Sequence, residues 1–188
     1  MSDHKQNLYF IALVPHIELR EQIKALKEEI KERFKAKHAL KSPAHITLQM
    51  PFKRSSDDEP YLIRTLEEFA SKQNAFRVDL SGFGCFSPRV IFVNVNDFEP
   101  IIAVHAKLQK VLIEKMAFEE NVITPKLHPH MTLATRDLRT KTFRGAWGEF
   151  KKKEFEASFL CQSLFLLKHN GKFWDIHREF LFNESDQK

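Results

Sequence analysis

Apolar residues recur along the first part of the chain with two different spacings. Residues 8–14 form an unbroken apolar run of strand length that ends at Pro15. After it, apolar residues return at three- and four-residue steps, which predicts a helix over residues 17–37 with one buried face. That face comprises Leu19, Ile23, Leu26, Ile30 and Phe34. Residues 44–48 lie between two prolines and are a candidate for a short strand.

The same order of elements returns in the middle of the chain. Residues 90–95 are rich in β-branched and aromatic side chains and predict a strand. A helix is expected over residues 100–116, and residues 130–134 form another short strand candidate. Two copies of strand, helix and short strand predict an α+β protein with two related lobes.

The other segments predict a further helix, a further strand and a hairpin. The helix is expected over residues 59–72, and the strand over residues 75–80, with a turn at residues 81–84. Residues 158–168 and 172–182 flank Asn170-Gly171, a pair that favours a type I′ hairpin turn. No Ser/Gly-rich linker divides the chain, so a single domain is expected over residues 1–188, with a polar tail from about residue 184.

A His-x-Thr-Leu tetrapeptide closes each repeated unit. It begins at His45 in the first unit and at His130 in the second. Shuffled chains of this composition would contain two copies roughly once in a thousand cases. Alternate side chains of a strand share a face, so each histidine should lie beside its threonine, Thr47 or Thr132, opposite a buried apolar face.

Two imidazoles and two hydroxyls suit a displacement at phosphorus. Imidazole titrates near neutral pH, so one ring can take a proton from water while the other gives a proton to a leaving oxygen. The threonine hydroxyls and the imidazoles can hold the non-bridging phosphate oxygens. Metal-dependent catalysis fits less well, because the sequence has no HExxH motif, no cysteine cluster and no carboxylate pair near the histidines.

Charge and composition narrow the class of protein further. The chain carries 30 Lys and Arg against 25 Asp and Glu, and this excess favours a phosphate-bearing or nucleic-acid ligand. The longest apolar run is far shorter than the ~20 residues of a membrane span, so no membrane partner is expected. The polar N-terminus lacks a signal-peptide core, and two cysteines make no disulfide framework. We therefore expect a cytoplasmic protein, and a monomer, because a core accounts for the apolar stripes.

The paired motifs and their surroundings resemble the two-histidine (2H) phosphoesterase superfamily, in its 2′-5′ RNA ligase-like branch. The likeness extends over nearly the whole chain and includes the segments 9–15, 43–48, 82–86 and 128–133. It implies a bilobal fold with an antiparallel sheet and flanking helices in each lobe, and with the two HxT strands facing a central cleft. It also implies hydrolysis of 2′,3′-cyclic or other nucleotide phosphodiesters, in some members reversible 2′-5′ ligation, and no cofactor.

The resemblance also assigns roles to the motif residues. His45 and His130 match the catalytic pair, and Thr47 and Thr132 match the phosphate-binding residues. Many members have Ala-Arg directly after the second motif, whereas here the arginine comes one place later, at Arg136. On a continuous strand this shift would turn the guanidinium to the other face.

Arg136 is nevertheless a candidate for substrate binding, and three further side chains join it. Phe86 and Arg89 could supply a stacking ring and a cation for phosphate, or equally a packed ring and a solvated charge. His128 has the same strand parity as His130 and could border the cleft.

The residues leave two classes of function open. The first is a metal-independent phosphodiesterase acting on a cyclic phosphate or a 2′-5′ linkage. The alternative is an RNA- or nucleotide-binding protein that uses the same basic cleft without turnover. The sequence does not distinguish among an RNA end, a small cyclic nucleotide and other phosphoesters as the substrate.

Overall fold

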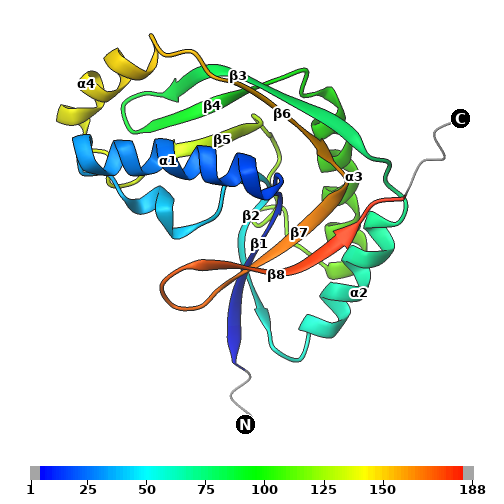
Figure 1. The fold of residues 1–188 in the computed structure, drawn as a ribbon. Helices are drawn as coiled ribbons and strands as arrows, with labels where there is room; N and C mark the ends of the chain where they lie inside the picture. The colour runs from blue at the N-terminus through cyan, green and yellow to red at the C-terminus, as the bar shows by residue number, and fades with distance from the viewer. Residues whose placement is uncertain (1–4, 184–188) are drawn as a thin grey trace, which may run out of the picture.

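Two four-stranded antiparallel sheets form the centre of the molecule (Figure 1), in a computed structural model that describes residues 5–183. The first sheet has the order β2-β1-β7-β8 and comprises Ile46–Ser55, Gln6–Leu13, Ser163–His169 and Trp174–Leu181. The second has the order β5-β4-β3-β6 and comprises His130–Ala134, Val90–Asn96, Phe76–Phe86 and Glu156–Cys161. The predicted bilobal α+β fold is thus confirmed.

The two sheets are built from the repeat seen in the sequence. In the first, β1 leads through α1 (Ile17–Phe34) into the edge strand β2. In the second, β4 leads through α3 (Glu99–Met116) into the edge strand β5. Each unit therefore delivers its His-x-Thr-Leu segment to the edge of its own sheet.

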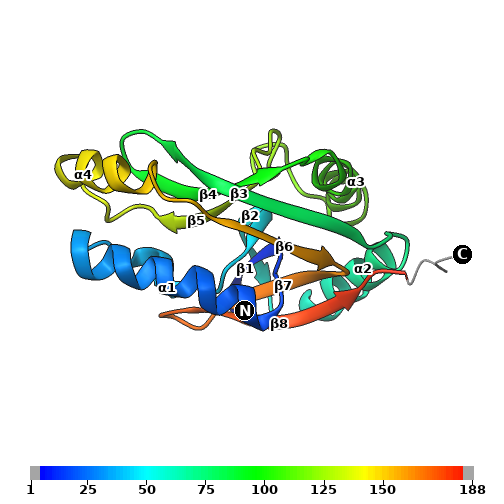
Figure 2. The same cartoon turned by 45° about the horizontal axis from the view of Figure 1, so that its top comes forward.

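The helices connect the two lobes. Figure 2 shows the second sheet with α3 and α4 (Thr140–Phe150) above the first sheet with α1 and α2 (Glu59–Ala70). Helix α1 contacts β5 and α4 of the other lobe, and α3 contacts β2. Buried residues of both sheets form one apolar cluster, which includes Ile11, Ile46, Ile91 and Met131. The two edge strands thereby face each other across a shared core.

Several boundaries differ from the sequence prediction. Residues 81–84 do not form a turn, since β3 continues through them to Phe86 with a bulge where Gly82 has φ +65°. Residues 158–168 are not one strand, because β6 belongs to the second sheet and β7 to the first. Strand β2 also continues through Pro51, as an edge strand permits. Helix α4 was not predicted at all.

The hairpin between β7 and β8 exists, but its turn differs from the predicted one. His169 pairs with Trp174, so four residues make the connection. The Asn170 amide donates to the Phe173 carbonyl at 2.9 Å, and only Gly171 has a positive φ, of 98°. A type I′ turn needs positive φ at both of its central residues, so the turn prediction was wrong.

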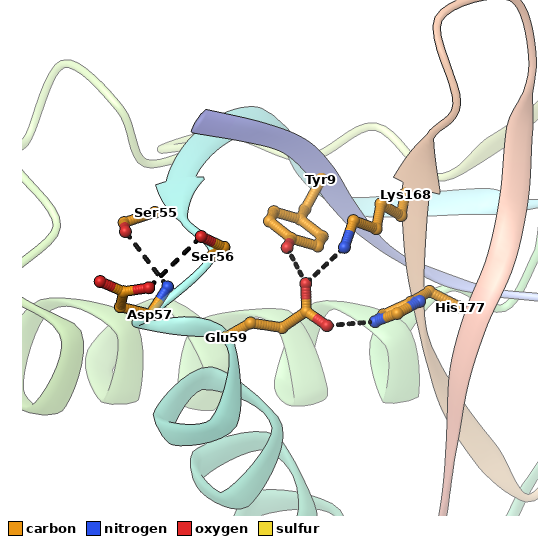
Figure 3. A network of polar contacts seen from close by, with 7 residues as sticks. All are labelled: Tyr9, Ser55, Ser56, Asp57, Glu59, Lys168 and His177. Carbon is orange, nitrogen blue, oxygen red and sulfur yellow. Dashed lines mark hydrogen bonds and ion pairs between the residues drawn. The ribbon is translucent and has the colours of Figure 1, made fainter. Parts of the chain in front are cut away.

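A carboxylate clamps the start of α2 to the first sheet (Figure 3). Glu59 accepts hydrogen bonds from the Tyr9 hydroxyl, from Lys168 Nζ at 2.6 Å and from His177 Nε2 at 2.8 Å. Burial by itself would raise the pKa of Glu59, but the bonds from Lys168, Tyr9 and His177 outweigh it and lower the pKa to about 2. Three strands are thus tied to one helix by a charged group.

No helix within residues 5–183 combines the length and the apolar character needed to cross a bilayer.

Candidate functional site

A cavity of about 450 Å³ lies between the two lobes and is lined by both motifs. His45 and Thr47 enter it from the first lobe, and His130 and Thr132 from the second. These four side chains are half-buried, whereas Ile46, Leu48, Met131 and Leu133 are buried in the core. The predicted alternation along each motif is therefore confirmed, and the fold brings the two motifs together.

Each histidine is oriented by the backbone just before it. His45 Nδ1 lies 2.8 Å from the Pro43 carbonyl oxygen, and His130 Nδ1 lies 2.6 Å from the His128 carbonyl oxygen. A carbonyl oxygen only accepts, so Nδ1 carries the proton in both rings. The Nε2 atoms are then the lone-pair nitrogens when the rings are neutral. Each neutral ring can therefore accept a proton at Nε2.

Both imidazoles favour the neutral form in the ligand-free site. Burial lowers the pKa of His45 to about 4, with a further contribution from the Lys27 charge. Burial likewise lowers the pKa of His130. An anionic phosphate between them would oppose this effect, because it stabilises an imidazolium. A bound phosphate would thus raise the pKa of a neighbouring ring, so that the ring can take up a proton from the solvent.

Lys27 lies behind His45 and was not identified from the sequence. Its Nζ donates to the Ala39 and Ser42 carbonyls at 3.0 Å each, with the Pro43 carbonyl at 3.5 Å. The pKa of this buried lysine is lowered to about 8 by desolvation. The same Pro43 carbonyl accepts from His45, so Lys27 fixes the segment that orients this ring.

Aromatic rings pack against both histidines. Phe10 lies 4.8 Å from His45 between ring centroids, and Phe92 lies 4.9 Å from His130. Trp174 packs edge-on against Phe10 at 4.7 Å and lines the cavity. Phe10 and Trp174 were not predicted as site residues, because an aromatic residue in a strand is ordinarily a core residue and nothing local distinguishes these two.

Three of the four secondary candidates line the cavity. Phe86 lies 5.2 Å from the His130 ring, and His128 lies 5.3 Å from the Phe86 ring. Arg136 also lines it, whereas Arg89 does not. The other cationic side chains of the lining are Lys41 and Lys126. Within the described part of the chain, no acidic side chain lines the cavity, so its charge suits an anion.

Arg136 does not lie on the strand face expected for a continuous strand, because the strand ends before it. Strand β5 ends at Ala134, and Arg136 adopts a left-handed backbone with φ +50°. The neighbouring Asp137 accepts from the amides of Lys37 and His38 in the other lobe, each at 2.9 Å. Strand parity does not apply beyond a strand end, and Arg136 lines the cavity. Among residues 5–183, no group of three or more His, Cys, Asp or Glu is placed to hold a metal ion.

The comparisons with known proteins agree with one another. A profile described as the 2′-5′ RNA ligase superfamily matches residues 15–173. A protein of Geobacillus sp. (strain WCH70), provisionally named a phosphoesterase, is 25% identical over 96% of this chain and 99% of its own. A Bacillus licheniformis protein, also provisionally named a phosphoesterase, is 24% identical over 92% of this chain and 97% of its own.

Solved structures have the same fold. E. coli LigT in its apo form matches with a TM-score of 0.68 and 16% identity, over 96% of this chain and 99% of that one. TT0787 of Thermus thermophilus matches with a TM-score of 0.67 and 18% identity, over 95% of this chain and 99% of that one. At these identities the likeness shows the fold alone.

Proposed function

The chain belongs to the 2′-5′ RNA ligase superfamily, and from this membership and the cleft geometry we propose a metal-independent phosphodiesterase that hydrolyses 2′,3′-cyclic phosphates or 2′-5′ phosphodiester bonds. The observation that carries the proposal is the pair of imidazoles, His45 and His130, held alike by Nδ1 and lining one cavity with their threonines. The family and its phosphoesterase relatives support an enzyme of the phosphoesterase class.

The proposed reaction is an in-line displacement at phosphorus. One neutral imidazole takes a proton from water on Nε2 as the water oxygen forms a bond to phosphorus. The other imidazole, protonated beside the bound phosphate, gives its proton to the 2′ or 3′ oxygen as that P–O bond breaks. One P–O bond forms and one breaks, with no net change in protons on the enzyme. The same displacement would form a 2′-5′ linkage if a ribose 5′-hydroxyl replaced water: its oxygen bonds to the phosphorus of a 2′,3′-cyclic phosphate as the P–O3′ bond breaks and the 3′ oxygen takes the proton.

The remaining polar groups of the cleft suit the charge that develops in this reaction. The Thr47 and Thr132 hydroxyls can donate to the two non-bridging oxygens. Arg136 and Lys126 add positive charge to the lining. Preorganised donors of this kind stabilise the transition state more than the ground state. The threonines are therefore proposed as phosphate-binding residues.

The cleft also contains features that suit a nucleotide. Phe10, Phe86 and Trp174 present aromatic surface beside the histidines, on which a base can stack. E. coli LigT, a relative in fold, has crystal structures in complex with 3′-AMP, with NADP+ and with ATP. These ligands support a nucleotide or RNA phosphoester as the substrate here.

The test is hydrolysis of nucleoside 2′,3′-cyclic monophosphates in the presence of EDTA. Wild type is expected to turn over, and His45→Ala and His130→Ala are each expected to lose on the order of 10²–10⁴-fold in kcat. His16→Asn is the matched control, because it removes an imidazole outside the cleft and keeps a capping side chain at the start of α1. Full activity in either alanine variant would refute the mechanism. Nucleotide binding by wild type without any product would favour the binding-protein alternative.

A further inference from the structure

We propose that a groove along α1, continuous with the cleft, binds the single-stranded RNA that precedes the reacting phosphoester. The groove encloses about 700 Å³ between α1 on one side and residues 37–44 and 172–174 on the other. Lys41, Ser42 and Trp174 line both the groove and the cleft, so the two spaces meet. This inference rests on the proposed function for the end of the substrate that reacts.

The charge of the groove is strongly positive. Seven cationic side chains line it against two carboxylates, Glu21 and Glu28, so its excess equals that of the whole chain. Besides the buried Lys27, the cations are Arg20, Lys24, Lys31, Lys37, Lys41 and Lys172. Helix α1 therefore turns a row of positive charge towards the groove, while its other face is buried in the core.

Most of this charge is available to a ligand. The two carboxylates form exposed pairs with Lys24 at 3.6 Å and Lys31 at 2.7 Å, which are weak in water. Within residues 5–183, no carboxylate lies within ion-pair distance of the other four exposed or half-exposed cations, Arg20, Lys37, Lys41 and Lys172. A row of cations of which four have no carboxylate partner among the described residues, next to the proposed phosphate-binding cleft, suits a polyanion better than a single nucleotide.

Aromatic side chains at the junction favour unpaired bases. Phe173 is 40% exposed at the rim of the groove, and Trp174 lies where groove and cleft meet. Trp174 packs on Phe10, which in turn packs on His45. A positive groove that follows the backbone, together with rings for base stacking, is the general design of single-strand binding sites. A base-paired end would hide the faces that these rings can contact.

The experiment compares a nucleoside 2′,3′-cyclic monophosphate with a short single-stranded RNA that ends in the same cyclic phosphate. Wild type should have at least about tenfold higher kcat/KM for the RNA, with a steeper decline as salt rises. Lys24→Glu/Lys31→Glu changes two side chains that line the groove and not the cleft. This variant should lose the advantage for RNA, and should keep mononucleotide hydrolysis within about twofold of wild type.

The matched control is Lys107→Glu/Lys110→Glu on α3, which lies on the other side of the molecule in both views (Figures 1 and 2). It makes the same change in net charge and should leave the preference for RNA intact. Equal kcat/KM for the two substrates in wild type, or equal losses in both double variants, would overturn the groove proposal. If wild type hydrolyses neither substrate, the proposed reaction fails, and anisotropy with a labelled single-stranded RNA decides the groove alone. A loss of affinity confined to the α1 variant would then support it, and equal affinity in both variants would overturn it.

Discussion

His45 Nδ1 lies 2.8 Å from a carbonyl two residues back, and His130 Nδ1 repeats the contact at 2.6 Å. The two rings therefore share one tautomer and present the same nitrogen to the cleft. In the proposed mechanism either ring can act as the base, and the position of the substrate would decide which of them accepts the proton.

The first prediction concerns the charge of these rings. In the ligand-free protein at pH 7, both should be neutral with the proton on Nδ1, and His45 should titrate with a pKa of about 4. Because the folded pKa of His45 lies below its ordinary value of 6.5, stability should fall as pH drops from 6.5 towards 4. Nitrogen NMR titration measures the charge, the tautomer and the pKa of each histidine, and denaturant unfolding across pH measures the stability. A charged ring at pH 7, or a proton on Nε2, would contradict the prediction.

Lys27 should depress the basicity of His45. Lys27→Met removes a buried positive charge, so the pKa of His45 should rise. The midpoint of the His45 titration should therefore move to higher pH. Lys110→Met removes an exposed lysine of α3 and should leave the titration unchanged. The same NMR titration tests the pair. An unchanged pKa in Lys27→Met would show that the charge is screened from the ring.

Arg136 should bind the phosphate, and Arg89 should not. Arg136→Ala is expected to lower kcat/KM for cyclic nucleotides by about 10- to 100-fold, the worth of one charge-assisted hydrogen bond. Arg89→Ala removes an arginine that does not line the cavity and should stay within about twofold of wild type. Steady-state kinetics of the two variants gives the answer. Equal losses would mean that the difference in placement has no functional consequence.

Gly84 should be required for the support of His130. An added Cβ would lie 2.3 Å from Phe92 Cε2 and 2.4 Å from Asn94 Oδ1, and the Phe92 ring packs on His130. Gly84→Ala should therefore destabilise the fold by about 1–3 kcal/mol and reduce turnover. Gly148→Ala in α4 meets nothing within 4 Å and should be neutral, or stabilising by up to about 1 kcal/mol. Denaturant unfolding of both proteins compares them, and equal stability would refute the steric argument.

The Glu59 clamp should make stability sensitive to acid. The lowered pKa of Glu59 means that its contribution is complete above about pH 4.5 and is lost as pH falls towards 2. Glu59→Gln should lower the free energy of unfolding by about 1–3 kcal/mol at neutral pH. The variant should also lose less stability than wild type as pH falls from 4.5 towards 2. Glu114→Gln removes an exposed pair at 3.8 Å and should cost under about 0.5 kcal/mol. Thermal melts across pH measure both, and a Glu59→Gln protein that is as stable as wild type would rule the clamp out.

The sequence by itself determined the repeat and the motif residues. The strand–helix–strand order of each lobe follows from local hydrophobic spacing, and period-two alternation places each histidine on the face of its threonine. It could not find the break at Gln162, where one apolar run becomes two strands in different sheets. The pairing of a strand depends on its partners in space, and those partners are distant in the chain.

Only the tertiary structure decided what surrounds the two motifs. Arg136 reaches the cleft because Asp137 binds backbone amides about a hundred residues earlier. Phe10 packs on His45 from β1, Trp174 packs on Phe10 from β8, and Lys27 of α1 approaches the Pro43 carbonyl that orients His45. None of these carries a local signal, because each acts through its distance to another segment. Residue types and spacing therefore determine which groups are the candidates for the reaction, whereas long-range packing sets their orientation, their pKa values and the shape of the cleft.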